Sequence, residues 1–93
     1  ASEQVDVVAV DGQGGLLVGE CKWGAIGSRD LDRLQRRGKL IAKELGGVAH
    51  TTHVLFSAGG LEAGEVAQRI EAGEAAYVSS EMLYEIPPTT LAS

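Results

Sequence analysis

Three residues near the start of the chain, Asp6, Glu20 and Lys22, have the types and spacing that metal-assisted phosphodiester chemistry requires. Glu20 and Lys22 lie two positions apart in an extended stretch, residues 16–23. Side chains alternate between faces along a strand, so these two side chains point the same way. Carboxylates are ligands of the kind that Mg²⁺ prefers, and a nearby lysine can stabilise charge that develops on a phosphate.

A turn-forming segment, residues 11–15, separates this stretch from an earlier β-branched stretch, residues 5–10, that carries Asp6. A hairpin centred on Gln13 pairs Asp6 with Glu20. Two carboxylates directly opposite each other repel, and a bound cation would compensate. We therefore predict that Asp6 and Glu20 bind Mg²⁺ or Mn²⁺, with the carbonyl of Cys21 as a further ligand. Lys22 would orient the attacking water or stabilise the transition state.

The pattern Glu-x-Lys is also common on solvated sheet faces, where the charges only keep an edge strand soluble. The neighbouring residues weaken that interpretation. Glu20 and Lys22 follow the apolar run Leu16-Leu17-Val18 and precede Trp23, which is a setting typical of buried rather than exposed side chains.

Asp6, followed by a hairpin into Glu20-Cys21-Lys22, resembles the PD-(D/E)XK, or restriction-endonuclease-like, nuclease superfamily. The string Gly19-Glu20-Cys21-Lys22-Trp23 and residues 52–61 are more similar to one branch, the domain of unknown function at the C-terminus of archaeal and bacterial AAA-type ATPases. Mrr-type endonucleases are similar more loosely. The resemblance spans residues 3–86 and implies a metal-dependent nuclease that acts on DNA, with homodimerisation because two strands require two sites.

The chain departs from that superfamily in two places. The ATPase-associated branch carries an acid two residues before the aspartate, where this chain has Gln4. The superfamily core also begins with a helix and a strand ahead of the hairpin. The resemblance therefore implies that residues 1–86 are one nuclease-like domain that lacks these two elements and belongs to a larger protein, with residues 87–93 as a flexible tail.

Charge and composition limit the function classes. The net charge of −5 is unlike the basic footprint of a free-standing DNA-binding domain. Cys21 is the single cysteine, which excludes an internal disulfide. No apolar stretch approaches the length of a membrane span and no signal peptide is visible, so we predict a cytoplasmic location without membrane association.

Residues 28–45 are predicted to form a helix, with Ser28 as its N-cap and Gly46-Gly47 after its end. An apolar stripe includes Gly38, where the missing side chain would let the helix lie close to a sheet. This stretch holds six of the eight basic residues. Its charged face is either a solvated surface or a phosphate-binding surface formed by Arg29, Arg33 and Arg36. Gln35 is similar to glutamines that assist the metal site in some superfamily members.

The second half alternates between strand and helix patterns: a strand at 52–57, a helix at 62–72, a strand at 75–78 and a helical turn at 80–84. His50 and His53 lack matching ligands and are interpreted as ordinary polar residues. With the opening hairpin, the order hairpin, helix, strand, helix, strand predicts the α/β class. The expected architecture is a restriction-endonuclease-like mixed sheet flanked by helices.

Three functional interpretations follow. The first is an Mg²⁺-dependent nuclease-like domain that hydrolyses DNA. The second is a catalytically inactive module of the same fold that serves interaction or dimerisation in a larger ATPase. The third, a small metal-binding or regulatory α/β domain unrelated to nucleic acids, has no motif in its favour.

Overall fold

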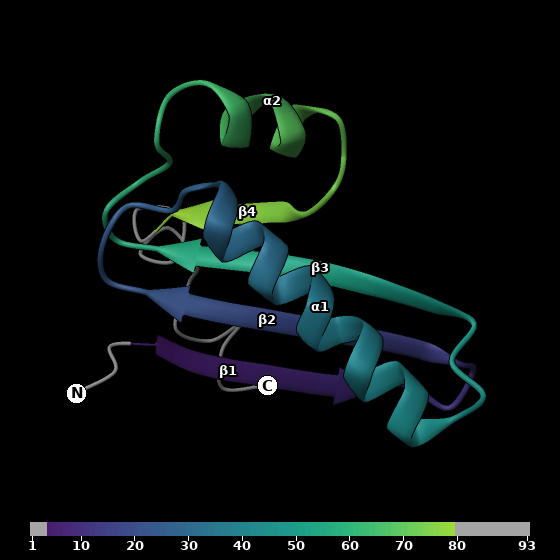
Figure 1. Ribbon diagram of the computed structural model, residues 1–93. Coiled ribbons are helices and arrows are strands. Elements are labelled where there is room, and N and C mark those ends of the chain that lie inside the picture. Colours follow the sequence, from purple (N-terminus) through teal and green to yellow (C-terminus); the bar gives the residue numbers. More distant parts are fainter. Residues whose placement is uncertain (1–3, 80–93) are drawn as a thin grey trace, which may run out of the picture.

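The computed structural model describes residues 4–79, with side chains described from residue 7 onward. Figure 1 shows the order of its elements. They are β1 (Gln4–Val10), β2 (Gly15–Lys22), α1 (Ser28–Leu45), β3 (His50–Ser57), α2 (Glu65–Glu71) and β4 (Ala76–Ser79). The predicted α/β class and the predicted order of elements are confirmed. The helical turn expected at 80–84 and the tail expected at 87–93 lie outside the described residues.

The four strands form one mixed sheet in the order β1-β2-β3-β4. The hairpin β1–β2 is antiparallel, whereas β2, β3 and β4 are parallel to one another. Parallel neighbours need a crossover, and α1 and α2 provide the two crossovers. Strand β2, which carries Glu20 and Lys22, therefore lies inside the sheet between β1 and β3.

The hairpin has the predicted register, with Asp6 opposite Glu20 and Val8 opposite Val18. The side chain of Asp11 fixes the turn. Its Oδ1 accepts hydrogen bonds from the backbone N–H groups of Gln13, at 2.7 Å, and Gly15, at 2.9 Å. A short acidic side chain that bonds to the backbone two residues later is a common turn-forming device.

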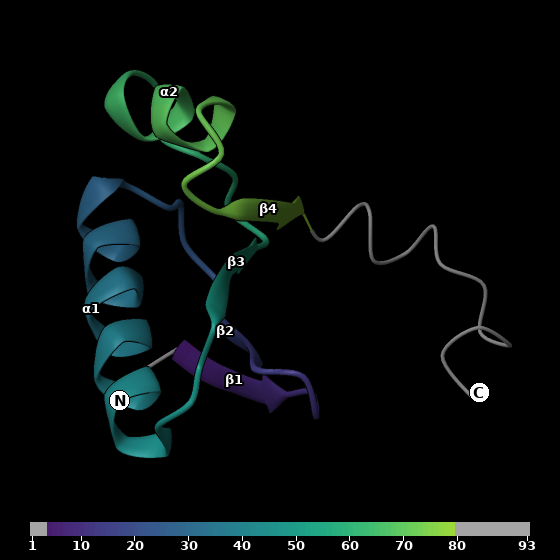
Figure 2. The ribbon, with the colours of Figure 1, turned by 90° about the vertical axis from the view of Figure 1, so that its right-hand side faces the viewer.

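Both helices pack on the same face of the sheet, as Figure 2 shows from the side. Side chains from the sheet, from both helices and from the connections between them form one core: Leu16, Val18, Ile26, Leu31, Leu34, Leu55, Val66 and Ala75. Glu20 and Lys22 share their face of β2 with Leu16 and Val18, since every second residue of a strand points the same way. The catalytic candidates on β2 therefore project toward the helices.

Helix α1 has the predicted bounds, but its N-cap is Gly27 and not Ser28. The reason is the side chain of Asp30, whose Oδ2 accepts a hydrogen bond from the backbone N–H of Gly27 at 2.9 Å. An acidic residue three positions after the N-cap that bonds back to it forms one half of a capping box. With the N-cap at Gly27, Asp30 lies in the first turn of α1, where its carboxylate contacts Lys22 at the carboxyl end of β2.

Gly38 brings α1 close to the sheet, as predicted. A Cβ atom at this position would lie 2.7 Å from Nε2 of His53 on β3. The imidazole of His53 is half-buried beneath the helix, and its Nε2 has no hydrogen-bond partner among the described residues. Burial lowers the pKa of His53, which keeps the ring neutral at pH 7. His53 is thus a packing residue, in line with its interpretation as an ordinary polar side chain.

The loops after β2 and β3 are held together at the end of the sheet. The hydroxyl of Ser57 donates to the carbonyl of Gly24 at 2.7 Å and accepts from the N–H of Gly59 at 2.9 Å. Further along, Ile26 and Leu61 form a parallel β-bridge. These bonds fix the loop from which α1 begins, and so they fix where its first turn lies.

The second helix is shorter than predicted, because α2 begins at Glu65 and not at residue 62. The N–H of Glu62 bonds to the carbonyl of Ile26 at 2.8 Å, which continues the extended bridge past Leu61. Gly64 then takes a φ of +95°, outside the helical range. The helix starts only after this glycine.

Candidate functional site

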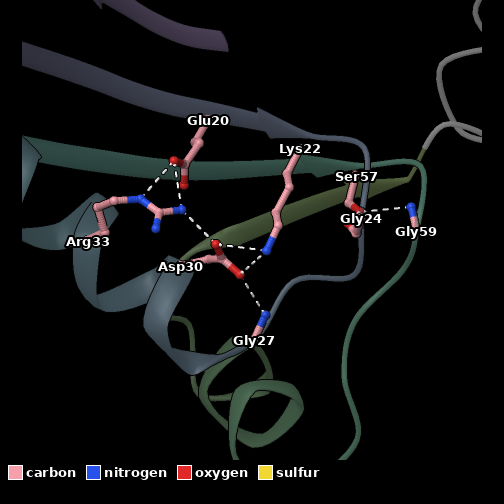
Figure 3. Close-up of polar contacts among 8 residues, drawn as sticks. All are labelled: Glu20, Lys22, Gly24, Gly27, Asp30, Arg33, Ser57 and Gly59. Carbon is pink, nitrogen blue, oxygen red and sulfur yellow. Dashed lines mark hydrogen bonds and ion pairs between the residues drawn. The ribbon is translucent and has the colours of Figure 1, made fainter. Parts of the chain in front are cut away.

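Glu20 and Lys22 lie on the same face at the carboxyl end of β2, under the first turns of α1 (Figure 3). Glu20 is 2% exposed, whereas 31% of the Lys22 side chain is exposed. Glu20 thus has the buried setting that the sequence suggested, while Trp23, at 71% exposure, does not. In open α/β sheets, ligands bind outside the carboxyl ends of the strands, which is where these two side chains lie.

Asp30, on the first turn of α1, joins them and was not among the predicted site residues. Its carboxylate is nearly buried, at 5% exposure. Oδ2 lies 3.0 Å and Oδ1 3.2 Å from Nζ of Lys22, and Oδ2 also accepts the Gly27 N–H. The spacing Gly27-x-x-Asp30 is a capping pattern that could have identified this residue, had the N-cap been assigned correctly.

Arg33 connects the two carboxylates. Its Nε donates to Oε1 of Glu20 at 3.0 Å, and its Nη2 lies 3.0 Å from that same oxygen. The same Nη2 donates to Oδ1 of Asp30 at 2.6 Å. Arg33 was predicted to contact phosphate; in the structure its guanidinium bonds to two acidic side chains of the chain itself. We call Glu20, Lys22, Asp30 and Arg33 the ion-pair cluster.

The charges of the ion-pair cluster balance, with two carboxylates against an ammonium and a guanidinium. Burial opposes ionisation of Asp30, but the Gly27 N–H, Lys22 and Arg33 together outweigh it and hold the pKa of this carboxyl below its usual range. Asp30 is therefore charged at pH 7. These charge-assisted hydrogen bonds join β2 to the first turns of α1.

Asp6 lies across the hairpin from Glu20 in the strand register. The carbonyl of Cys21 belongs to the next residue of β2. Within residues 4–79 there is no group of three or more His, Cys, Asp or Glu side chains placed to hold a metal ion. Mg²⁺ does not require one, because it is commonly held by one or two carboxylates together with waters and substrate phosphates. Carboxylate and carbonyl oxygens are donors of the kind that this ion prefers, and in the structure the carboxylates of Glu20 and Asp30 bond to Arg33 and Lys22.

The other predicted site residues lie on α1 at different positions around the helix. Arg29 and Arg36 are exposed to solvent. Gln35 lies toward α2, where its amide donates to Glu74 at 3.1 Å and its oxygen accepts from Arg69 at 3.3 Å. The structure thus brings Arg33 to Glu20 and Lys22, and it directs Gln35 to a different set of partners.

Comparisons of the chain with protein-family models, curated proteins and solved structures gave no significant match. Neither helix of residues 4–79 is long and apolar enough to cross a membrane. The functional argument therefore depends on the geometry of the site.

Proposed function

We propose that this chain is a divalent-cation-dependent nuclease-like domain of the restriction-endonuclease-like type. The observation that carries the proposal is the juxtaposition at the end of β2. The hairpin register sets Asp6 opposite Glu20, and Lys22 lies on the same face one pleat further on, with partial access to solvent. A carboxylate can hold a cation that activates water, and a nearby ammonium group can stabilise the charge that develops on a phosphate.

In this proposal Asp6, Glu20 and the Cys21 carbonyl hold the ion, Mg²⁺ or Mn²⁺. When bound, the cation supplies Lewis acidity to the scissile phosphate and acidifies an attacking water. Lys22 places a positive charge where negative charge develops on the phosphoryl oxygens, or it orients the attacking water. Asp30 keeps that ammonium group in position through its two short contacts.

DNA is the proposed substrate, and its backbone would contact the exposed side of α1. Arg29 and Arg36 are exposed there and are free of the packing that surrounds the apolar stripe. Contacts to phosphates from such side chains position a duplex without reading its sequence. A homodimer, or association with the rest of a larger chain, would supply a second site or further basic surface.

A cleavage assay tests the proposed function. We expect the chain to cut DNA in Mg²⁺ or Mn²⁺ and not in EDTA, and Glu20→Gln to lower the rate by at least about 100-fold, since a ligand of the cation is lost. Glu71→Gln, at an exposed position on α2, is the matched control and should leave the rate unchanged. Cleavage that persists in EDTA, or an undiminished rate in Glu20→Gln, would contradict the proposal.

Two observations favour the second interpretation, an interaction module without chemistry. Lys22 and Arg33 balance the two described carboxylates, so the ion-pair cluster needs no metal for its charge. The edge strand β1 also exposes Val8 and Val10, at 50% and 62%, which is a feature of sheets that pair with a further strand. This interpretation expects a stable assembly through β1 and no cation binding at Glu20.

A further inference from the structure

The guanidinium of Arg33 lies between two buried carboxylates, those of Glu20 and Asp30. Its Nη2 lies 3.0 Å from Oε1 of Glu20 and 2.6 Å from Oδ1 of Asp30 (Figure 3). Both oxygens converge on one nitrogen from different elements, β2 and α1. Lys22 differs from Arg33 in this respect, since both oxygens that its ammonium group contacts belong to Asp30.

A divalent ion cannot bind between these two carboxylates while Nη2 of Arg33 lies there. Mg²⁺ binds carboxylate oxygens at about 2.1 Å, so the two carboxylates would need to close by only about an ångström to hold it. Two cations cannot share that space, because like charges a few ångströms apart repel strongly near a protein surface. The guanidinium must move before an ion can bind to both oxygens.

We propose that Arg33 is an internal competitor for the divalent cation, and that Asp30 is a further ligand of that cation once Arg33 has left. The inference deepens the proposed function and depends on it for the presence of a cation at Glu20. It adds Asp30 to the ligands expected from the hairpin, and it assigns Arg33 the role of a positioning residue. While Arg33 bonds to both carboxylates, it keeps Glu20 and Asp30 in place without a metal ion.

Calorimetric titration with Mn²⁺ alone tests this. We expect Arg33→Gln to bind Mn²⁺ at least about tenfold more tightly than the unaltered chain, because the competing charge is removed. Arg36→Gln, an exposed arginine one turn further along α1, is the matched control and should change the affinity less than twofold. Adding Asp30→Asn to Arg33→Gln should abolish the gain. Equal or weaker binding by folded Arg33→Gln, or a gain that survives Asp30→Asn, would overturn the proposal.

A second measurement, by NMR, uses the unaltered chain and so does not depend on whether a variant folds. In the unaltered chain, the Nε–H of Arg33 donates to Oε1 of Glu20 at 3.0 Å, so its NMR signal reports on this bond. Titration with Mg²⁺, which is diamagnetic, should shift the Arg33 signal in a saturable way and leave the Arg36 signal in place. An Arg33 signal that stays constant while Mg²⁺ binds would overturn the proposal.

The failure of this inference can be told apart from the failure of the proposed function. If the chain cleaves DNA in Mg²⁺ but Arg33→Gln binds Mn²⁺ no more tightly, the competitor role alone is wrong. If no cleavage occurs while Arg33→Gln gains affinity that depends on Asp30, the cation site exists and hydrolysis is wrong.

Discussion

Replacing Asp30 with asparagine is expected to lower the free energy of unfolding by about 2–3 kcal/mol at pH 7. Removing one member of a buried ion pair costs about 3–5 kcal/mol, and the partial exposure of Lys22 and Arg33 reduces that figure. Asparagine keeps an oxygen for the Gly27 N–H, so the loss reports mainly on the charge. Urea denaturation followed by circular dichroism measures it.

The effect of Asp30→Asn should depend on pH in a defined direction. The folded pKa of Asp30 is held below its unfolded value, so its contribution is complete above about pH 5 and is lost as the pH falls through about 4 and below. The difference in stability between the unaltered chain and Asp30→Asn should therefore shrink as the pH falls below about 4. Asp32→Asn is the control, because Asp32 is half exposed and its ion pair with Arg69 should contribute less than about 1 kcal/mol. An Asp30 loss no larger than the Asp32 loss would contradict the structural role of the cluster.

Replacing Lys22 with methionine is expected to lower the rate of DNA cleavage by about 100- to 1000-fold, the usual effect of removing one group that stabilises charge in the transition state. Methionine preserves the length of the side chain and removes Nζ, the atom within 3.2 Å of both Asp30 oxygens. The affinity for Mn²⁺ should not fall, because Lys22 is not a ligand and its replacement removes a positive charge beside Asp30. The cleavage rate and the calorimetric Kd, measured on the same preparation, check both parts.

Lys39→Met is the matched control for Lys22→Met, since Lys39 is an exposed lysine on α1 away from the cluster. Lys22→Arg should retain part of the rate because it keeps the charge. A full rate in Lys22→Met, or a loss of rate that merely follows a loss of fold, would show that Lys22 takes no part in the chemistry.

Local patterns in the sequence were enough to predict the hairpin and the long helix. The turn residues around Gln13 set the register, and the structure shows that Asp11 enforces it through two backbone hydrogen bonds. The glycine on the apolar stripe, Gly38, predicted a close approach to the sheet, and a side chain there would meet His53. Both features depend on residues near one another in the chain or on a single periodic face.

The ion-pair cluster could not be predicted in the same way, because its members belong to different elements. In the sequence Asp30 is one of several charged residues of the predicted helix, and only the exit of the chain from β2 and the start of α1 at Gly27 bring it to Lys22. The same geometry turns Arg33 inward to Glu20, whereas Gln35, two residues later, points toward α2. Assignment of the N-cap to Gly27 would have identified Asp30 as a capping residue, but not its contact with Lys22.

Calorimetric titration of the unaltered chain with Mn²⁺, repeated on Asp6→Asn and Glu20→Gln, tests the central claim most directly, because it requires no knowledge of the natural substrate. A cation site between β1 and β2 predicts saturable binding by the unaltered chain that each of the two substitutions abolishes. An unaltered chain without saturable binding, or an equal Kd in folded Asp6→Asn, would contradict the claim and favour the interaction module.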